Sequence, residues 1–275
     1  MQKILKYSWL FIFISFTLVS CEKVIDLDLN TAEPRLVIEG NITSNPGPYL
    51  VSLSTSGDYY TTHGINPVSG ANIIISNELG HADTLFEFKP GIYHTSTLTG
   101  ETNRTYTIVV DYNGKEYSGS ETLPHKVYID SLSYEKMEFT GPGGGGGEDK
   151  PRYSIYCTFL DPIETVDYYR FDILVNGIPM GGFRSYYYLA SDQLFNGHIV
   201  QYPIRWVESQ PGDTVTISLH TIGFNTWEYF RTLNDALSGG GMGSTPYNPI
   251  TNLSNNALGY FGAYAIDSKN LVVGQ

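Results

Sequence analysis

Positive charge is scarce in this sequence of 275 residues. Lys and Arg together number 16 against 28 Asp and Glu, so the net charge is -12 at pH 7, and charged residues make up only 16% of the chain. Proteins that bind DNA or RNA need clustered Lys and Arg side chains to neutralise phosphate groups. We therefore expect no nucleic-acid partner. Attachment to an anionic membrane would have to be covalent or inserted.

Motifs of catalysis and metal binding are also missing. The sequence contains no H-E-x-x-H, no paired C-x-x-C, no G-x-S-x-G and no phosphate-binding glycine motif. The six His residues are scattered, and no two of them have metal-ligand spacing: His63, His81, His94, His125, His198 and His220. We therefore expect a non-enzymatic protein with no catalytic residue, metal or cofactor. A hydrolase, the alternative class, would require an acid and a base that converge in a cleft.

Methionine is rare, with 4 residues, whereas Tyr and Phe number 22 and 13. Tyr and Phe favour the pleated, half-buried surface of a β-sheet. Short runs rich in Val, Ile, Thr and Tyr between turn residues support the same interpretation. The sequence therefore predicts a mostly β protein.

The N-terminus has the pattern of an export signal. Lys3 and Lys6 precede the apolar run Tyr7–Val19, which is too short for a membrane span of about 20 residues. The next stretch resembles the lipobox of bacterial lipoproteins and consists of Leu18, Val19, Ser20 and Cys21. In that motif the cysteine becomes the first residue of the mature chain, and its thiol receives a diacylglycerol.

We therefore expect residues 1–20 to be a lipoprotein signal peptide and Cys21 to be the lipidation site. An ordinary signal with a chance cysteine, or a short uncleaved anchor, is the alternative. Residues 21–34 would form a polar, acidic tether. Because Cys21 would carry lipid, Cys157 has no partner for a disulfide, and its strand-like surroundings predict a buried, inert thiol.

Residues 35–124 are expected to form a seven-stranded antiparallel sandwich of the immunoglobulin-like or transthyretin-like type. Asn113-Gly114 is the strongest hairpin signal, because both residues tolerate positive φ. The predicted strands are Leu36–Thr43, Tyr49–Thr55, Ala71–Ser76, Ala82–Lys89, Ile92–Thr97, Thr105–Tyr112 and Lys115–Thr122.

Residues 125–275 are expected to form a second β-rich domain that contains one short helix. The predicted strands begin at Ile129 and continue with Tyr153–Leu160, Tyr168–Val175, Gly182–Leu189, Ile199–Trp206 and Thr214–Thr221. Gly143–Gly147 reads as a flexible loop, since it lacks the Gly-Lys-Ser/Thr ending of a phosphate-binding loop.

The helix is predicted at about 226–238, with Asn225 as its cap and Glu228 as the reciprocal partner. Its core face would consist of Trp227, Phe230, Leu233 and Leu237.

Tyrosine clusters offer a further possible function. They would either stack sugar rings or fill the core and cross-strand pairs, and they are Tyr59-Tyr60, Tyr186-Tyr187-Tyr188 and Tyr202.

Several sequence blocks follow one another in a distinctive order between residues 21 and 265. They are Cys21–Asp26, Leu36–Gly40, Gly70–Ile75, Gly80, Gly91–Tyr93, Thr105–Ile108, Ser218–Ile222, Glu228–Phe230, Pro246–Asn252 and Ala257–Ala263. In this order they resemble the DUF4249 family of outer-membrane lipoproteins of Bacteroidetes. The first domain also resembles carboxypeptidase-regulatory-like and transthyretin-like sandwiches.

The resemblance implies a lipid-anchored protein of the outer membrane and carries over no catalytic residue or ligand. It implies an accessory binding component that works with a TonB-dependent receptor in nutrient uptake; a surface adhesin or glycan-binding lipoprotein is the alternative. Glu22, Asp26 and Asp28 resemble a dispersed acidic signal for the cell surface, and a linker facing the periplasm fits equally. Segments Gly57–Ser69 and Ser238–Ser254 are the expected contact surfaces, with simple loop closure as the alternative.

Overall fold

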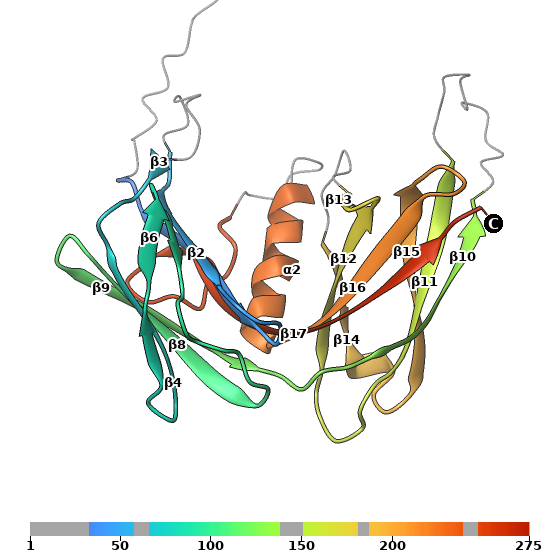
Figure 1. Cartoon of the computed structure of the whole chain (residues 1–275), viewed down its shortest axis with the longest axis horizontal. Coiled ribbons are helices and arrows are strands. Elements are labelled where there is room, and N and C mark those ends of the chain that lie inside the picture. Colours follow the sequence, from blue (N-terminus) through green and yellow to red (C-terminus); the bar gives the residue numbers. More distant parts are fainter. Residues whose placement is uncertain (1–32, 58–65, 138–150, 181–186, 239–246, 275) are drawn as a thin grey trace, which may run out of the picture. The chain divides into compact units, whose positions relative to one another are not determined.

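The computed structural model describes residues 33–57, 66–137, 151–180, 187–238 and 247–274. Within these residues the chain is mostly β, with three sheets and one α-helix, as the sequence predicts (Figure 1). No helix in the described ranges is long and apolar enough to cross a membrane. The signal peptide, Cys21 and most of the tether lie outside the described residues, as do Tyr59, Tyr60, Tyr186 and Gly143–Gly147.

The first region is a sandwich of two sheets. One layer is part of a ten-stranded sheet and contains β1 (Leu36–Thr43), β2 (Leu50–Thr55), β3 (Asn66–Pro67), β6 (Phe86–Lys89) and β7 (Ile92–His94). The other layer has the strand order β5-β4-β8-β9 and contains β4 (Asn72–Asn77), β5 (Ala82–Thr84), β8 (Arg104–Tyr112) and β9 (Lys115–Leu123). Buried and exposed residues alternate along β1 and β8, so one face of each strand fills the core between the layers.

The predicted strand Ala82–Lys89 is wrong, because the chain changes sheets in its middle. β5 pairs with β4, whereas β6 pairs with β7 of the other layer. Leu85 lies between them, with a buried side chain and an N–H that donates to Ile73 O. The residue types in these eight positions are typical of a single strand. They do not indicate the point at which the chain crosses from one layer to the other.

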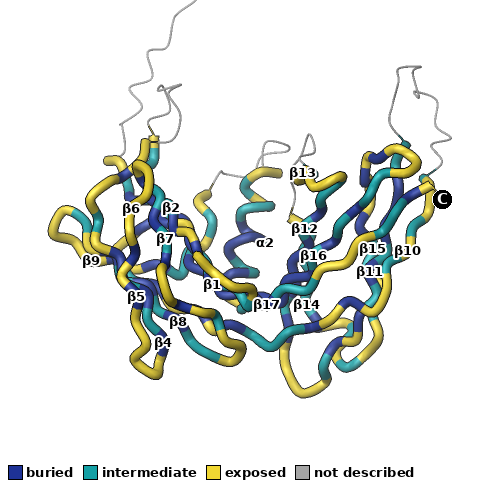
Figure 2. The backbone as a smooth tube through the Cα atoms, in the orientation of Figure 1, coloured by how far each residue is buried: buried dark blue, intermediate teal, exposed yellow. Residues whose placement is uncertain are grey.

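The second region is also built from two layers. Its part of the ten-stranded sheet contains β12 (Tyr168–Val175), β13 (Ile178–Pro179), β14 (Tyr188–Ser191) and β16 (Thr214–Ile222). The three-stranded sheet has the order β10-β11-β15 and contains β10 (Ile129–Lys136), β11 (Arg152–Leu160) and β15 (Ile199–Glu208). A short 3-10 helix, η2 (Asp192–Leu194), follows β14. Figure 2 shows buried residues recurring along the strands of both regions.

The long strand β17 (Leu258–Val272) belongs to both regions. Its first half pairs in parallel with β1, from Val37↔Leu258 to Thr43↔Tyr264, and its second half pairs antiparallel with β16. The sequence predicted neither this strand nor a parallel pair. The first core takes residues from this C-terminal part of the chain, namely Leu253, Ala257, Phe261, Ala263 and Ala265. The first core therefore draws on residues from both sides of residue 124, and both cores lie within one compact unit, Pro34–Gln275.

The helix α2 (Phe224–Ser238) begins two residues before the expected start. Asn225 therefore does not cap it, and the N–H of Trp227 donates to Gly223 O. The free N-terminal N–H groups find another acceptor: Glu121 of β9 accepts hydrogen bonds from Thr226 N and Thr226 Oγ1 at 3.2 and 3.1 Å. Burial raises the pKa of Glu121, although these bonds act in the opposite direction.

The core face of α2 is rotated from the predicted one. Thr226, Tyr229, Phe230 and Thr232 are its buried residues, whereas Leu237 is exposed. The helix packs on β17, β12 and β14.

The two tight turns agree with the sequence, since Asn113 and Gly114 have φ values of 51° and 73°, and Asn176 and Gly177 have 51° and 79°.

Candidate binding pocket

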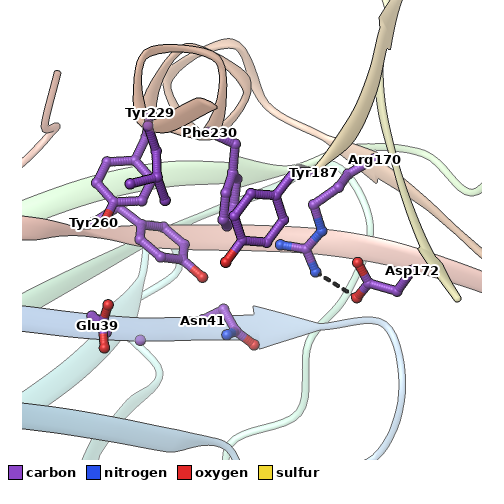
Figure 3. Close-up of a pocket in the computed structure, with 10 residues that line it drawn as sticks. Glu39, Asn41, Arg170, Asp172, Tyr187, Tyr229, Phe230 and Tyr260 are labelled. Carbon is purple, nitrogen blue, oxygen red and sulfur yellow. Dashed lines mark hydrogen bonds and ion pairs between the residues drawn. The ribbon is translucent and has the colours of Figure 1, made fainter. Parts of the chain in front are cut away.

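A pocket of about 310 Å³ lies between α2 and the ten-stranded sheet. Its floor comes from three strands: Glu39 and Asn41 of β1, Arg170 and Asp172 of β12, and Tyr260 of β17. Its other side comes from Tyr229, Phe230 and Leu233 of α2 and from Tyr187, just before β14. Figure 3 shows these side chains converging from the helix and from the strands.

Strand alternation explains why polar groups gather on this face. In β12, Tyr169, Phe171 and Ile173 enter the second core, so Arg170 and Asp172 point to the opposite face of the sheet. In β1 the core residues Ile38 and Ile42 flank Glu39 and Asn41 in the same way; Glu39 is exposed, and Asn41 is half-buried. The pocket is therefore on the face of the sheet that turns away from both cores.

Arg170 is the buried cation of the pocket, with its side chain only 9% exposed. Its Nη2 donates to Asp172 Oδ2 at 2.9 Å and lies 3.3 Å from His220 Nδ1. The guanidinium also lies over the rings of Phe230 and Tyr264, at 4.7 and 5.0 Å. Its Nε is buried and has no hydrogen-bond partner among the described residues. The residue nevertheless lines the pocket, so its guanidinium supplies positive charge and N–H donors there.

His220 of β16 contacts both Arg170 and Asp172. Burial, followed by the nearby charge of Arg170, lowers the pKa of His220 to about 4, so the imidazole is neutral at pH 7. Its Nε2 lies 3.3 Å from Asp172 Oδ2. A neutral ring with its proton on Nε2 directs that N–H toward Asp172 and offers Nδ1 as an acceptor to Arg170. His220 thereby orients both charged groups of the pocket.

Aromatic rings form a continuous wall on the helix side. Tyr229 and Tyr260 stack with ring centroids 4.6 Å apart, and Phe230 meets Tyr260 edge-on at 5.0 Å. Tyr187 packs on Phe230 at 4.5 Å. Burial raises the pKa of Tyr187 and of Tyr229, so both hydroxyls stay protonated at neutral pH. The wall therefore offers apolar ring surface together with neutral hydroxyl groups.

Tyr187 is fixed to the helix by a paired amide contact. Its backbone N donates to Asn234 Oδ1 at 2.9 Å, and Asn234 Nδ2 donates to Tyr187 O at 2.9 Å. A side-chain amide that bonds both backbone groups of one residue restricts its position. The pocket wall is thus tied to α2.

A second group of polar residues, Asp161, Asp167 and Asp192, is buried at one end of the second region. Among the described residues these carboxylates have oxygens within 4.8 Å of one another, as in a metal site. They accept hydrogen bonds from the surrounding loops: Gly197 N to Asp161, Thr165 Oγ1 to Asp167 and Asp167 N to Asp192. Burial raises the pKa of Asp167. These hydrogen bonds explain why the three carboxylates are buried together, because they hold the surrounding loops in place.

The sequence-predicted residues fall in different places. Cys157 is fully buried, and burial raises its pKa to about 12, which agrees with an inert thiol. Tyr202 stacks on Phe171 at 4.3 Å and donates to Leu189 O, so it packs at the second core rather than forming a platform. Of the tyrosines suggested for sugar stacking, Tyr187 lines the pocket. The expected contact loops lie partly outside the described residues, which omit 58–65 and 239–246.

Sequence reasoning missed Arg170, Asp172 and His220. The available signal was the alternation in Tyr168–Val175, where two charged residues share one face of a strand whose other face is aromatic. The sequence did not indicate which strands lie next to β12. In the structure β16 brings His220 opposite Arg170. β17 then joins β16 to β1.

Comparison with known protein families gives one match, to a family described as a domain of unknown function, DUF4249, over residues 22–270. Comparison with curated proteins gives no match. The matched range includes every residue of the pocket.

Proposed function

Since the chain belongs to the DUF4249 family, whose description assigns no activity, we propose that it is a non-enzymatic lipoprotein of the outer membrane. In this proposal it binds a small polar ligand and serves as an accessory component of a TonB-dependent receptor in nutrient uptake. The pocket beneath α2 is the observation that carries the binding role, because it combines the largely buried guanidinium of Arg170 with an aromatic wall.

The pocket is suited to holding a molecule in place. Arg170 and Asp172 are fixed by each other and by His220, so their hydrogen-bonding directions are set before a ligand arrives. Tyr187 is likewise held by Asn234. Groups that are already ordered lose little conformational entropy on binding, which favours affinity. This preorganisation supports a binding protein.

The membrane anchor rests on the N-terminal sequence. Two lysines, an apolar run and the lipobox Leu18-Val19-Ser20-Cys21 support acylation of Cys21. One acyl chain gives only marginal attachment, whereas two or three hold a protein stably. Residues 21–34 would then separate the folded part from the lipid, and either face of the outer membrane is compatible with this arrangement.

Acylation and the receptor partnership are tested together in cells. Cys21→Ser should abolish incorporation of labelled fatty acid and release the protein from membranes, whereas Cys157→Ala should retain both properties. Gentle solubilisation of the wild-type protein should recover a TonB-dependent receptor with it. Acyl labelling that persists in Cys21→Ser contradicts the anchor, and repeated recovery without an outer-membrane receptor contradicts the partnership.

A surface adhesin or glycan-binding lipoprotein is the second candidate, favoured by an aromatic group at the start of α2. Phe224 is half-exposed and lies 5.5 Å from Tyr168, which in turn lies 5.1 Å from Trp227. Such a group can stack on an extended glycan. Tight binding on a glycan array by a protein that recovers no receptor, and loss of that binding in Phe224→Ala, would favour this function over the first.

A further inference from the structure

The size of the pocket beneath α2 limits what it can hold. At about 310 Å³ it lies at the small end of the range for ligand sites. A polymer or a folded partner does not fit in this space, whereas a molecule of one or two small rings does. The ligand is therefore a small molecule or the end of a chain.

The charges of the pocket disfavour an ionic ligand. Arg170 contributes one positive charge, and Asp172 and Glu39 contribute two negative ones, while His220 is neutral. An anion that approaches Arg170 also meets Asp172, which is already 2.9 Å from the guanidinium. A cation would compete with Arg170 itself, whose guanidinium occupies the face of Phe230. A neutral molecule avoids both conflicts.

The hydrogen-bonding groups point to a molecule with several hydroxyls. The Asn41 amide offers both a donor and an acceptor, and the Arg170 guanidinium that lines the pocket adds N–H donors. Glu39 supplies acceptor oxygens at the exposed side. A hydroxyl donates and accepts at once, so adjacent hydroxyls satisfy such a mixed set. Opposite these groups, Tyr187, Tyr229 and Tyr260 present ring surface to C–H groups (Figure 3).

From this combination we propose that the pocket binds a neutral monosaccharide or disaccharide. The sugar ring lies against the tyrosine wall, and its hydroxyls bond the Arg170 guanidinium, Asn41 and Asp172. The inference rests on the proposed binding function and names the ligand class of that pocket. It assigns the specificity to Asn41 together with Tyr187, because Asn41 supplies both a donor and an acceptor and Tyr187 belongs to the aromatic wall that faces it.

The test is a titration of the detergent-solubilised, lipidated full chain with a panel of sugars, observed by saturation-transfer NMR. The panel contains glucose, galactose, mannose, N-acetylglucosamine and their common disaccharides, with glucuronate and glucosamine as charged comparators. We expect at least one neutral sugar to bind and to bind more tightly than its charged counterparts. Tighter binding of glucuronate or of glucosamine overturns the neutral class.

Variants locate the binding. Tyr187→Ala should weaken it by about tenfold or more, equivalent to about 1.4 kcal/mol, whereas Tyr187→Phe keeps the ring and should stay close to wild type. Asn41→Ala should weaken binding as well, without touching either core. Tyr128→Ala removes an exposed tyrosine that is not part of the pocket and is the matched control. Equal affinity in Tyr187→Ala and Tyr128→Ala overturns the assignment to this pocket.

The failure of this inference is distinguishable from failure of the proposed function. Wild-type protein that binds no neutral sugar of the panel, yet still co-purifies with a TonB-dependent receptor, overturns the saccharide assignment and leaves the accessory role intact. Sugar binding that depends on Tyr187, without any receptor, supports the saccharide assignment and argues against the receptor partnership.

Discussion

The two cores of this protein use polar groups in different ways. In the first region, buried tyrosine hydroxyls donate to nearby backbone oxygens, as Tyr93 does to Val68 O at 3.0 Å. Its buried carboxylate Asp83 accepts backbone N–H groups of residues 96–98. The second region also buries Arg170 and His220, on the side of its sheet away from the core, and a cluster of three aspartates. Buried ionisable groups are costly for stability, and two of those in the second region, Arg170 and His220, line or support the candidate pocket.

The strand that joins the regions should give the largest effect. Gly259 of β17 has φ +88°, and a Cβ there would collide with the carbonyl oxygen of Ile38 on β1. Gly259→Ala should therefore lower the free energy of unfolding by about 4 kcal/mol, combining backbone strain with overpacking. Denaturant unfolding measures this loss.

Gly80→Ala is the matched control for that prediction. Gly80 has φ +83°, but nothing lies within 4 Å of a Cβ at that position. Its loss should be about 1 kcal/mol, from backbone strain alone. Equal losses for the two variants would show that the close contact between β1 and β17 is unimportant.

Acid should affect the second region through His220. Its pKa in the folded protein is about 4, lowered from 6.5. The unfolded chain therefore binds the proton more readily than the folded one. As the pH falls from about 6.5 toward 4, protonation of the unfolded chain lowers the free energy of unfolding, whereas above about pH 6.5 His220 causes no such loss. The loss amounts to as much as about 3 kcal/mol. Unfolding free energies measured across this pH range should show the slope.

His220→Gln should flatten that pH dependence, whereas His81→Gln, at an exposed site in the first region, should preserve it. A slope that survives in His220→Gln would assign the acid sensitivity to other groups.

The carboxylate of Asp83 behaves differently. Burial alone would raise its pKa, but hydrogen bonds from Thr97 and Leu98 lower it, so its contribution is lost only at more acidic pH.

The two hairpins should respond alike, because their turns have the same geometry. Gly114 in the first region and Gly177 in the second both have positive φ and open space around a Cβ. Gly114→Val and Gly177→Val should each cost about 1–2 kcal/mol. Thermal or denaturant melts measure both. A clear difference between the two, or an unchanged midpoint in either, would contradict an equal local cost in the two regions.

The smallest effect concerns Cys157, which reports on the second core alone. Its buried thiol with a raised pKa should not react with a thiol reagent in the native protein and should react fully after unfolding. The Cys21→Ser variant leaves Cys157 as the sole thiol and makes the measurement unambiguous. Rapid labelling under native conditions would show that the second core opens readily.

Local patterns predicted much of the fold. Alternation in Leu36–Thr43 identified β1, the strand-like run Tyr168–Val175 identified β12, and Asn-Gly pairs identified two hairpins. Long-range pairing was not predictable in this way. The parallel match of β1 with β17 joins residues more than two hundred positions apart, and no local pattern encodes that register.

The pocket escaped prediction for the same reason. It takes residues from β1, β12, β17 and α2, and each of these contributes only one to three of them. The helix cap shows the effect on a smaller scale: Asn225 is a good local cap, but Glu121, more than a hundred residues away, supplies the acceptor. Tertiary contacts of this kind override local preference.

The shared strand β17 has a consequence for the order in which the chain can fold. Until Phe261 and Ala263 arrive, the first core lacks part of its apolar filling, and β1 lacks its parallel neighbour. The first region therefore stays incompletely closed while the preceding residues emerge. A truncation before Leu258 would accordingly remove the closing strand of both sandwiches at once.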